Sequence, residues 1–65
     1  MLTSNVKKIM EEKGVTIRAL VERTRLADVT ILRARREQIA QCKLETLETI
    51  ANSLGCKVKD LFEET

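Results

Sequence analysis

Apolar residues recur three or four positions apart through most of this chain, and that spacing is the strongest constraint on its fold. The clearest run is Leu44, Leu47, Ile50, Ala51 and Leu54, and it ends at Gly55. Because an α-helix has about 3.6 residues per turn, residues spaced in this way share one face. Glycine often follows the last residue of a helix. The run therefore predicts an amphipathic helix over residues 44–54 that packs its apolar face into a core.

Shorter runs of the same kind predict the other helical segments. One extends from about Ser4 to Lys13 and is ended by Gly14. A second extends to Thr24 with Thr16 as its N-cap, and a third covers about residues 28–36. Residues 37–43 show no clean period and are expected to form a connecting loop. The last predicted segment is a short turn of helix with the apolar residues Val58, Leu61 and Phe62.

The composition agrees with an all-α fold. The chain has 65 residues, no Pro, two Gly and one aromatic residue. So few aromatic and turn-forming residues argue against a β-sandwich or barrel. A chain of this size forms one domain with a small core, because domains of about 60 residues bury only about 60% of their unfolded surface. We therefore predict a single domain over residues 1–65, built as a compact bundle of five short helices.

Missing residue types exclude most catalytic and metal chemistry. The chain has no His, the commonest general acid or base, and only two Cys. Two thiols without His cannot supply the four ligands of a structural zinc site within one chain. We therefore expect no enzymatic activity, no cofactor and no metal.

The chain shows no segment that predicts secretion or a membrane span. Met1 is followed by Leu-Thr-Ser-Asn and not by a basic stretch and an apolar run. No stretch approaches the roughly 18 apolar residues that a span needs. A cytoplasmic protein without membrane contact is expected, with Cys42 and Cys56 reduced and at least partly buried. Redox sensing, or a metal shared between subunits, is the alternative role for the two thiols.

The charges are segregated along the chain. Residues 16–43 carry six Arg and one Lys against three acids, whereas residues 44–65 carry two Lys against five acids. Every arginine lies in the central segment, and the planar guanidinium suits bidentate contact with phosphate or guanine. The pattern favours a central anion-binding surface. The alternative is an ordinary solvated face of a charged helical protein.

Four motifs, in this order, point to a known family. They are Glu-Lys-Gly-Val-Thr at 12–16, Thr-Ile at 30–31, Leu-Glu-Thr-Leu-Glu-Thr-Ile-Ala-Asn-Ser-Leu-Gly-Cys at 44–56, and Lys-Asp-Leu-Phe at 59–62. The succession resembles the Cro and phage-repressor type helix-turn-helix family, often called Xre-like, over essentially the whole chain. The resemblance implies a lambda-repressor-like DNA-binding domain whose helix-turn-helix covers about residues 17–36.

The resemblance also implies which residues face DNA. In this family the helix at 28–36 lies in the major groove, with its N-terminal residues toward base edges. The base-reading positions would be Asp28, Val29, Leu32 and Arg33. Arg33 can bind guanine O6 and N7, and Val29 and Leu32 can contact a thymine methyl. Asp28 can accept from cytosine N4, but its role as a negative charge near a helix N-terminus is the favoured alternative.

Other residues are expected to contact DNA phosphates or to pack the two helices against each other. The implied phosphate contacts are Thr16, Arg18, Thr30, Arg35, Arg36, Gln38 and Lys43, which would position the protein on the duplex without reading sequence. The residues expected to pack the two helices together are Leu20, Val21, Leu26, Ile31 and Ala34.

Four positions depart from the family pattern. Ile17 stands where Gln is common, Val21 replaces a small Ala, Arg25 occupies the usual glycine of the turn, and Glu37 replaces a second glycine. A non-glycine residue at positive φ costs about 1 kcal/mol, so the turn at Arg25 is expected to be either adjusted or slightly strained. Together Ile17, Val29 and Leu32 predict an apolar strip on the DNA-facing side. This strip could contact thymine methyls, or it could bind a protein partner, as in an antitoxin or an anti-repressor complex.

The function that these features favour is a transcriptional repressor that binds operator DNA as a homodimer. One small domain makes few DNA contacts, so specific binding normally needs two copies on half-sites about one helical turn apart. Val58, Leu61 and Phe62 are the candidate dimer contact. The equal alternative is that these three side chains close the core of the monomer.

Overall fold

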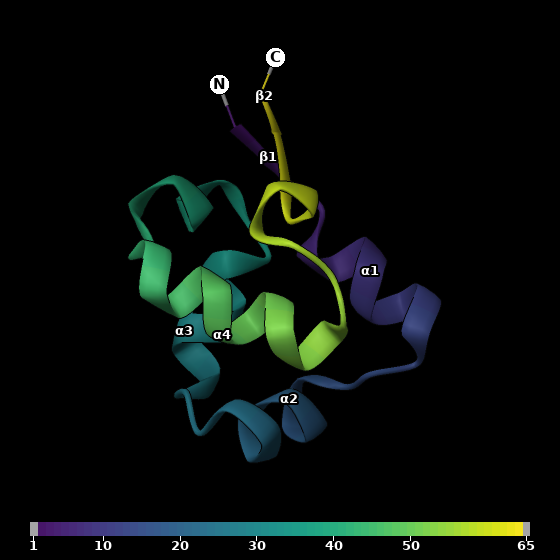
Figure 1. Ribbon diagram of the computed structural model, residues 1–65. Helices are drawn as coiled ribbons and strands as arrows, with labels where there is room; N and C mark the ends of the chain where they lie inside the picture. Colours follow the sequence, from purple (N-terminus) through teal and green to yellow (C-terminus); the bar gives the residue numbers. More distant parts are fainter. Residues whose placement is uncertain (1, 65) are drawn as a thin grey trace.

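The structure, a computed structural model, describes residues 2–64. Four α-helices, two 3-10 helices and two short strands follow one another along the chain (Figure 1). In order they are β1 (Leu2–Ser4), α1 (Val6–Lys13), α2 (Ile17–Thr24), α3 (Asp28–Ala34), η1 (Glu37–Gln41), α4 (Leu44–Leu54), η2 (Val58–Asp60) and β2 (Phe62–Glu64). The predicted helical domain is confirmed, with the expected fifth helix reduced to the 3-10 helix η2.

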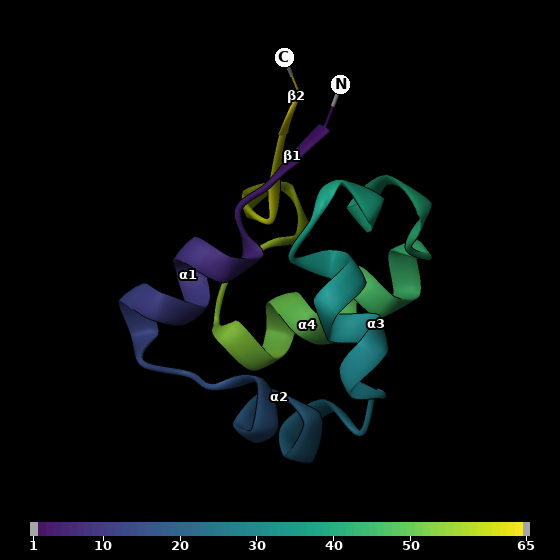
Figure 2. The same cartoon turned by 180° about the vertical axis from the view of Figure 1, so that it is seen from behind.

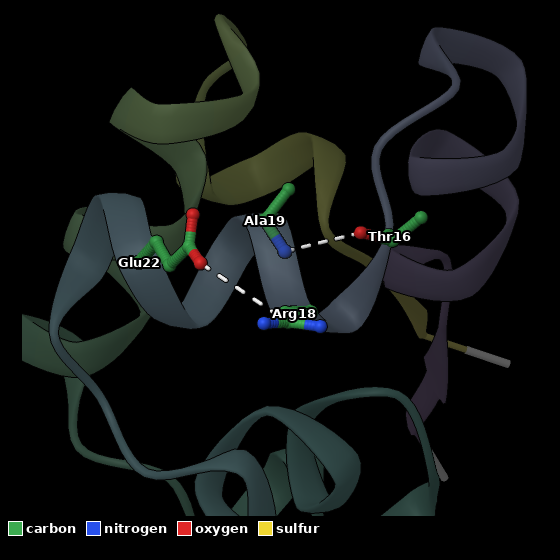
Figure 3. A network of polar contacts seen from close by, with 4 residues as sticks. All are labelled: Thr16, Arg18, Ala19 and Glu22. Carbon is green, nitrogen blue, oxygen red and sulfur yellow. Dashed lines mark hydrogen bonds and ion pairs between the residues drawn. The ribbon is translucent and has the colours of Figure 1, made fainter.

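The helix ends follow the local chemistry that the sequence predicted. Gly14 and Gly55 have φ of 65° and 71°, the left-handed conformation that ends α1 and α4. The hydroxyl of Thr16 accepts a hydrogen bond from the backbone N–H of Ala19 at 3.0 Å, which caps α2 (Figure 3). The capping residues therefore set these three boundaries locally, before any tertiary packing is considered.

The core lies between the four helices, with α4 at its centre (Figures 1 and 2). Each helix contributes the residues at its inward spacing, and η1, α4 and the C-terminal segment complete the cluster. The buried apolar residues are Val6, Met10, Leu20, Ile31, Ala34, Ile39, Leu47, Ile50, Ala51, Leu54 and Leu61. The predicted packing set is confirmed in this way: Leu20, Ile31 and Ala34 are buried, and Val21 and Leu26 are half-buried against them.

Several predicted boundaries were wrong, and one apolar residue expected in the core is exposed. Ser4 belongs to β1, so α1 begins only at Val6. Helix α3 ends at Ala34, because the backbone of Arg36 is extended and leads into η1. Residues 37–43 are not a plain loop, since η1 carries Ile39 into the core with 1% of its surface exposed. Leu44 lies one turn beyond the core and is 64% exposed.

The two ends of the chain pair with each other, which the sequence did not predict. Strands β1 and β2 are antiparallel, and Thr3 lies opposite Glu63 (Figures 1 and 2). Beside the sheet, the backbone N–H of Asn5 donates to the carbonyl of Leu61 at 2.7 Å. The hydroxyl of Ser4 donates to the carbonyl of Ala34, at the end of α3. The sheet therefore links both termini to the helix-turn-helix segment.

Leu61 corrects one of the candidate dimer contacts. Its side chain is fully buried within the monomer, between η2 and β2. A side chain without exposed surface cannot contact a second copy of the chain while this fold is intact. Leu61 therefore fills the core of the monomer, which was the alternative to a dimer contact. Val58 and Phe62 pack against the same core but keep part of their surface exposed.

Arg25 adopts the strained one of the two turn conformations that were expected. It is the one non-glycine residue with positive φ in the described chain, at 60°, and its N–H donates to the carbonyl of Val21 at 2.8 Å. Its side chain is exposed. The conformation therefore costs energy without an evident compensating contact of the side chain.

Replacing this residue by glycine is expected to stabilise the protein. Arg25→Gly removes the steric cost of the left-handed conformation, and the larger entropy of the unfolded glycine chain offsets part of that gain. The net increase in the free energy of unfolding should be about 0.5–1 kcal/mol. Thermal denaturation would show it as a rise in Tm of about 3–6 °C. Arg25→Ala is the control, because it removes the same side chain but keeps the Cβ; an equal gain in both variants would contradict the argument.

Candidate nucleic-acid interface

Helices α2 and α3 are joined by the short turn of residues 25–27, and buried side chains fix their relative position. Leu20 of α2 and Ile31 and Ala34 of α3 have no exposed surface. The capped start of α2 and the start of α3 therefore have fixed positions relative to each other. A rigid pair of short helices with one free face is the arrangement that helix-turn-helix proteins present to DNA.

The face of α3 away from the core carries the residues predicted to read bases. Asp28, Val29 and Arg33 are exposed, with Val29 at 49%, and Leu32 is half-buried. The carboxylate of Asp28 accepts a hydrogen bond from the N–H of Val29 at 2.8 Å. This contact places the carboxylate at the first turn of α3, where the favoured alternative, a negative charge near the helix N-terminus, expects it.

One surface hollow brings α3, η1 and the start of α4 together. We call it the η1 hollow; it is lined by Thr30, Arg33, Gln38, Gln41, Cys42, Lys43 and Thr46. Arg33 and three of the predicted phosphate contacts meet here: Thr30 from α3, Gln38 from η1 and Lys43 from the N-cap position of α4. Among these lining residues two are cationic and none is acidic. The hollow therefore presents donors and positive charge on one side of α3.

Cys42 adds no negative charge to the η1 hollow. Burial raises the pKa of its thiol, and the positive charge of Arg33 opposes that rise only partly. Burial also raises the pKa of Cys56, with a further contribution from Asp60 and opposition from Lys13. Both thiols are free and half-buried, as expected for Cys42 and Cys56. At neutral pH both remain protonated, so the positive charges of Arg33 and Lys43 are not offset by a thiolate.

The second hollow lies on the other side of α3. We call it the Lys7 hollow; Lys7, Leu32, Arg35 and Arg36 line it. It holds the two predicted phosphate contacts at the end of α3 together with a third cation from α1. The acidic residue that follows them in sequence, Glu37, is not part of the lining. Three cations around one aliphatic side chain favour binding of an anion.

The third hollow lies between the starts of α2 and α3. We call it the Ile17 hollow; Ile17, Arg18, Val21 and Asp28 line it. Ile17 of α2 therefore lies in a different hollow from Leu32, whereas Val29 and Leu32 are one turn apart on α3.

Arg18 makes the single ion pair found within residues 2–64. Its Nε lies 3.8 Å from Oε1 of Glu22, one turn further along α2 (Figure 3). The two side chains are 92% and 71% exposed. An exposed pair of this kind contributes at most about 1 kcal/mol. Arg18 can therefore exchange this partner for a phosphate at little cost.

A comparison with protein families decides what this arrangement is. Residues 5–64 match the model of the Cro/C1-type HTH DNA-binding domain. The chain belongs to this family. Comparison with curated proteins and with solved structures returned no match.

Membership in the Cro/C1-type family identifies the partner as DNA. The family is one of DNA-binding domains and not of enzymes. The predicted family, fold and absence of an enzyme family are therefore confirmed. In the part of the chain that the structure describes, no helix is both long enough and apolar enough to span a bilayer.

The structure adds residues to the surface of this Cro/C1-type domain that sequence reasoning missed. Gln41 and Thr46 line the η1 hollow, and Lys7 lines the Lys7 hollow. The unpredicted 3-10 turn of η1 places Gln41, so the lack of periodicity at 37–43 concealed it. Lys7 precedes Arg35 by 28 positions in the sequence. Only its position on the exposed face of an amphipathic α1 could have indicated that it was free for binding.

Proposed function

We propose that this Cro/C1-type domain is a sequence-specific transcriptional repressor that binds operator DNA as a homodimer. The single domain of residues 1–65 would place α3 in the major groove. The observation that best supports the proposal is the η1 hollow, where Arg33 of α3 meets Gln38 of η1 and Lys43, the N-cap residue of α4. This arrangement lets one side chain reach a base while its neighbours hold the adjacent phosphates.

Each proposed contact follows from the position of its side chain. Arg33 is the primary base reader, because its exposed guanidinium, in the last turn of α3, can bind the O6 and N7 of guanine. Val29 and Leu32 would contact thymine methyls, and Asp28 would accept from an amino group of a base. The proposed phosphate contacts are Thr16, Arg18, Thr30, Arg35, Arg36, Gln38 and Lys43. Thr16 already accepts from Ala19, so its contact would be made by the neighbouring backbone N–H groups.

The dimer is proposed because one domain offers a small footprint. Two copies related by a two-fold axis would read half-sites about 34–36 Å apart. Val58 and Phe62 are the remaining candidates for the contact, since each keeps some exposed surface. The C-terminal segment that carries them is acidic. An acidic segment would be repelled by phosphate, which favours its placement away from the duplex.

The test of this function is selection of bound sequences from a random duplex library. A palindromic consensus would support sequence reading, two-fold symmetry and the half-site spacing together. No enrichment of any sequence would contradict the proposal. That outcome would favour the alternative, a protein-binding module of the same fold that uses the apolar side chains of Ile17, Val29 and Leu32.

Arg33 and Arg36 are expected to differ in what they contribute to binding. Arg33→Ala should weaken binding to the selected operator by about 1–3 kcal/mol and relax the preference at one base pair. Arg36→Ala should weaken binding to all duplexes alike, because it contacts phosphate only. Binding to the operator and to its single-base variants would be measured by fluorescence anisotropy.

An exposed arginine outside the three hollows provides the control for this comparison. Arg23 lies in the last turn of α2. Arg23→Ala removes the same charge and should change neither the affinity nor the base preference appreciably. If Arg33→Ala and Arg36→Ala change the base preferences in the same way, the division between base reader and phosphate contact is wrong.

A further inference from the structure

The Ile17 hollow places two aliphatic side chains that have no proposed DNA contact beside the carboxylate of Asp28. Ile17 and Val21 lie one turn apart on α2 and are both half-buried, so they present aliphatic surface. Asp28, the first residue of α3, brings an exposed carboxylate to the same hollow. Arg18 completes the lining. An aliphatic surface with a hydrogen-bond acceptor beside it selects a ligand that has a methyl group next to a donor.

Among the base edges in the major groove, this pair of groups occurs in one modified base. Cytosine presents an N4 amino donor, and thymine presents a C5 methyl beside the O4 acceptor. Adenine presents its N6 amino donor beside the N7 acceptor. Only 5-methylcytosine places a methyl group directly beside an amino donor on one edge. A carboxylate repels the O4 of thymine and attracts the N4 amino group.

The carboxylate of Asp28 is free to act in this way. One oxygen, Oδ1, accepts from the N–H of Val29 at 2.8 Å, which holds the carboxylate in place. The other oxygen makes no hydrogen bond within the described residues and is open to a donor. The neighbouring Arg18 is committed only to a loose pair with Glu22, at 3.8 Å. Its positive charge reduces the repulsion between Asp28 and the phosphates of the duplex.

We propose that the Ile17 hollow reads 5-methylcytosine, with the methyl group against Ile17 and Val21 and the N4 amino group donating to Asp28. This inference rests on the proposed function, because it needs α3 in the major groove. It would make operator recognition depend on cytosine methylation. The shared lining supports it, since the aliphatic side chains of Ile17 and Val21 and the carboxylate of Asp28 meet in one hollow.

The test begins with two parallel selections and continues at one base pair. Random duplex libraries containing either cytosine or 5-methylcytosine are selected against the full chain. At the position where the methylated library is enriched, duplexes with 5-methylcytosine, cytosine, thymine and uracil are then compared. The methyl group should increase affinity about fourfold, both for 5-methylcytosine over cytosine and for thymine over uracil, because one methyl group is buried. The amino group should favour 5-methylcytosine over thymine by roughly 5- to 150-fold.

Two substitutions separate the methyl effect from the amino effect. Ile17→Ala should reduce the methyl ratio toward one and leave the amino preference intact. Asp28→Ala should abolish the amino preference and leave the methyl ratio intact; because Asp28 is exposed, this variant should fold. Circular dichroism checks the fold of both variants. Arg23→Ala, outside the hollow, should keep both ratios.

The outcomes distinguish failure of the reader from failure of the proposed function. If neither library is enriched, the repressor function and the reader are both overturned. If an operator is selected but cytosine and 5-methylcytosine bind equally, only the reader is overturned. A methyl effect that persists in Ile17→Ala also overturns it, because the methyl group is then held elsewhere.

Discussion

Raising the salt concentration from about 50 to about 200 mM is expected to weaken operator binding by roughly 10⁴-fold. Each subunit of the proposed dimer offers four cations to phosphates, namely Arg18, Arg35, Arg36 and Lys43. Each neutralised phosphate releases condensed counterions from the duplex, and the slope of log K against log salt is about −0.9 per phosphate. Eight contacts in the dimer therefore predict a slope near −7. Fluorescence anisotropy over a series of salt concentrations would measure it.

Removing single cations tests which residues produce that slope. Arg36→Ala should make the slope shallower by about two in a dimer, one contact from each subunit. Lys59→Ala is the matched control, because Lys59 is an exposed cation of η2 and lies in the acidic C-terminal segment. Its removal should leave the slope unchanged. An affinity indifferent to salt would contradict the phosphate contacts as a group.

The parts of the fold that the sequence predicted well are those decided by neighbouring residues. The bounds of α2 and α4 follow from apolar spacing together with a capping Thr16 and a terminal Gly55. These bounds need no knowledge of the rest of the chain, so one sequence suffices. At Arg25 the family resemblance left an adjusted or a strained turn open, and the φ of 60° is that of the strained turn.

The parts that the sequence did not predict depend on contacts between distant residues. Strands β1 and β2 have three residues each, too few to show the alternation that marks a strand. Their pairing joins opposite ends of the chain. In the same way, the helical turn of η1 forms because Ile39 reaches the core, and a single apolar residue has no period to detect.

The candidate interface likewise has features set by neighbouring residues, which could be predicted, and features set by contacts between separate segments, which could not. The exposed face of α3 follows from helical spacing, so Val29 and Arg33 were placed correctly on the surface. The three hollows could not be predicted, because each one joins segments that lie apart in the sequence. The pairing of Ile17 with Asp28, on which the proposed reading of 5-methylcytosine rests, depends on the angle between α2 and α3.

Leu61→Ala is expected to remove most of the stability of the protein. Burial of Leu61 is complete, and loss of a buried leucine typically costs about 2–5 kcal/mol. A domain of this size has a free energy of unfolding of about 3–10 kcal/mol, so the variant should be largely unfolded or marginal. Leu61 also joins η2 to β2, and its carbonyl accepts from Asn5 beside the terminal sheet. Urea denaturation followed by circular dichroism would measure the change.

Leu44→Ala is the matched control for this prediction, because it is the same substitution at a leucine that is 64% exposed. Surface substitutions of this kind usually change stability by less than about 0.5 kcal/mol. The comparison also decides between the two roles once open to Leu61. If Leu61 is a core residue, its substitution lowers the midpoint of unfolding at every protein concentration. If Leu61→Ala unfolded like Leu44→Ala and only weakened self-association in sedimentation, Leu61 would be a dimer contact, and its burial in the monomer would be contradicted.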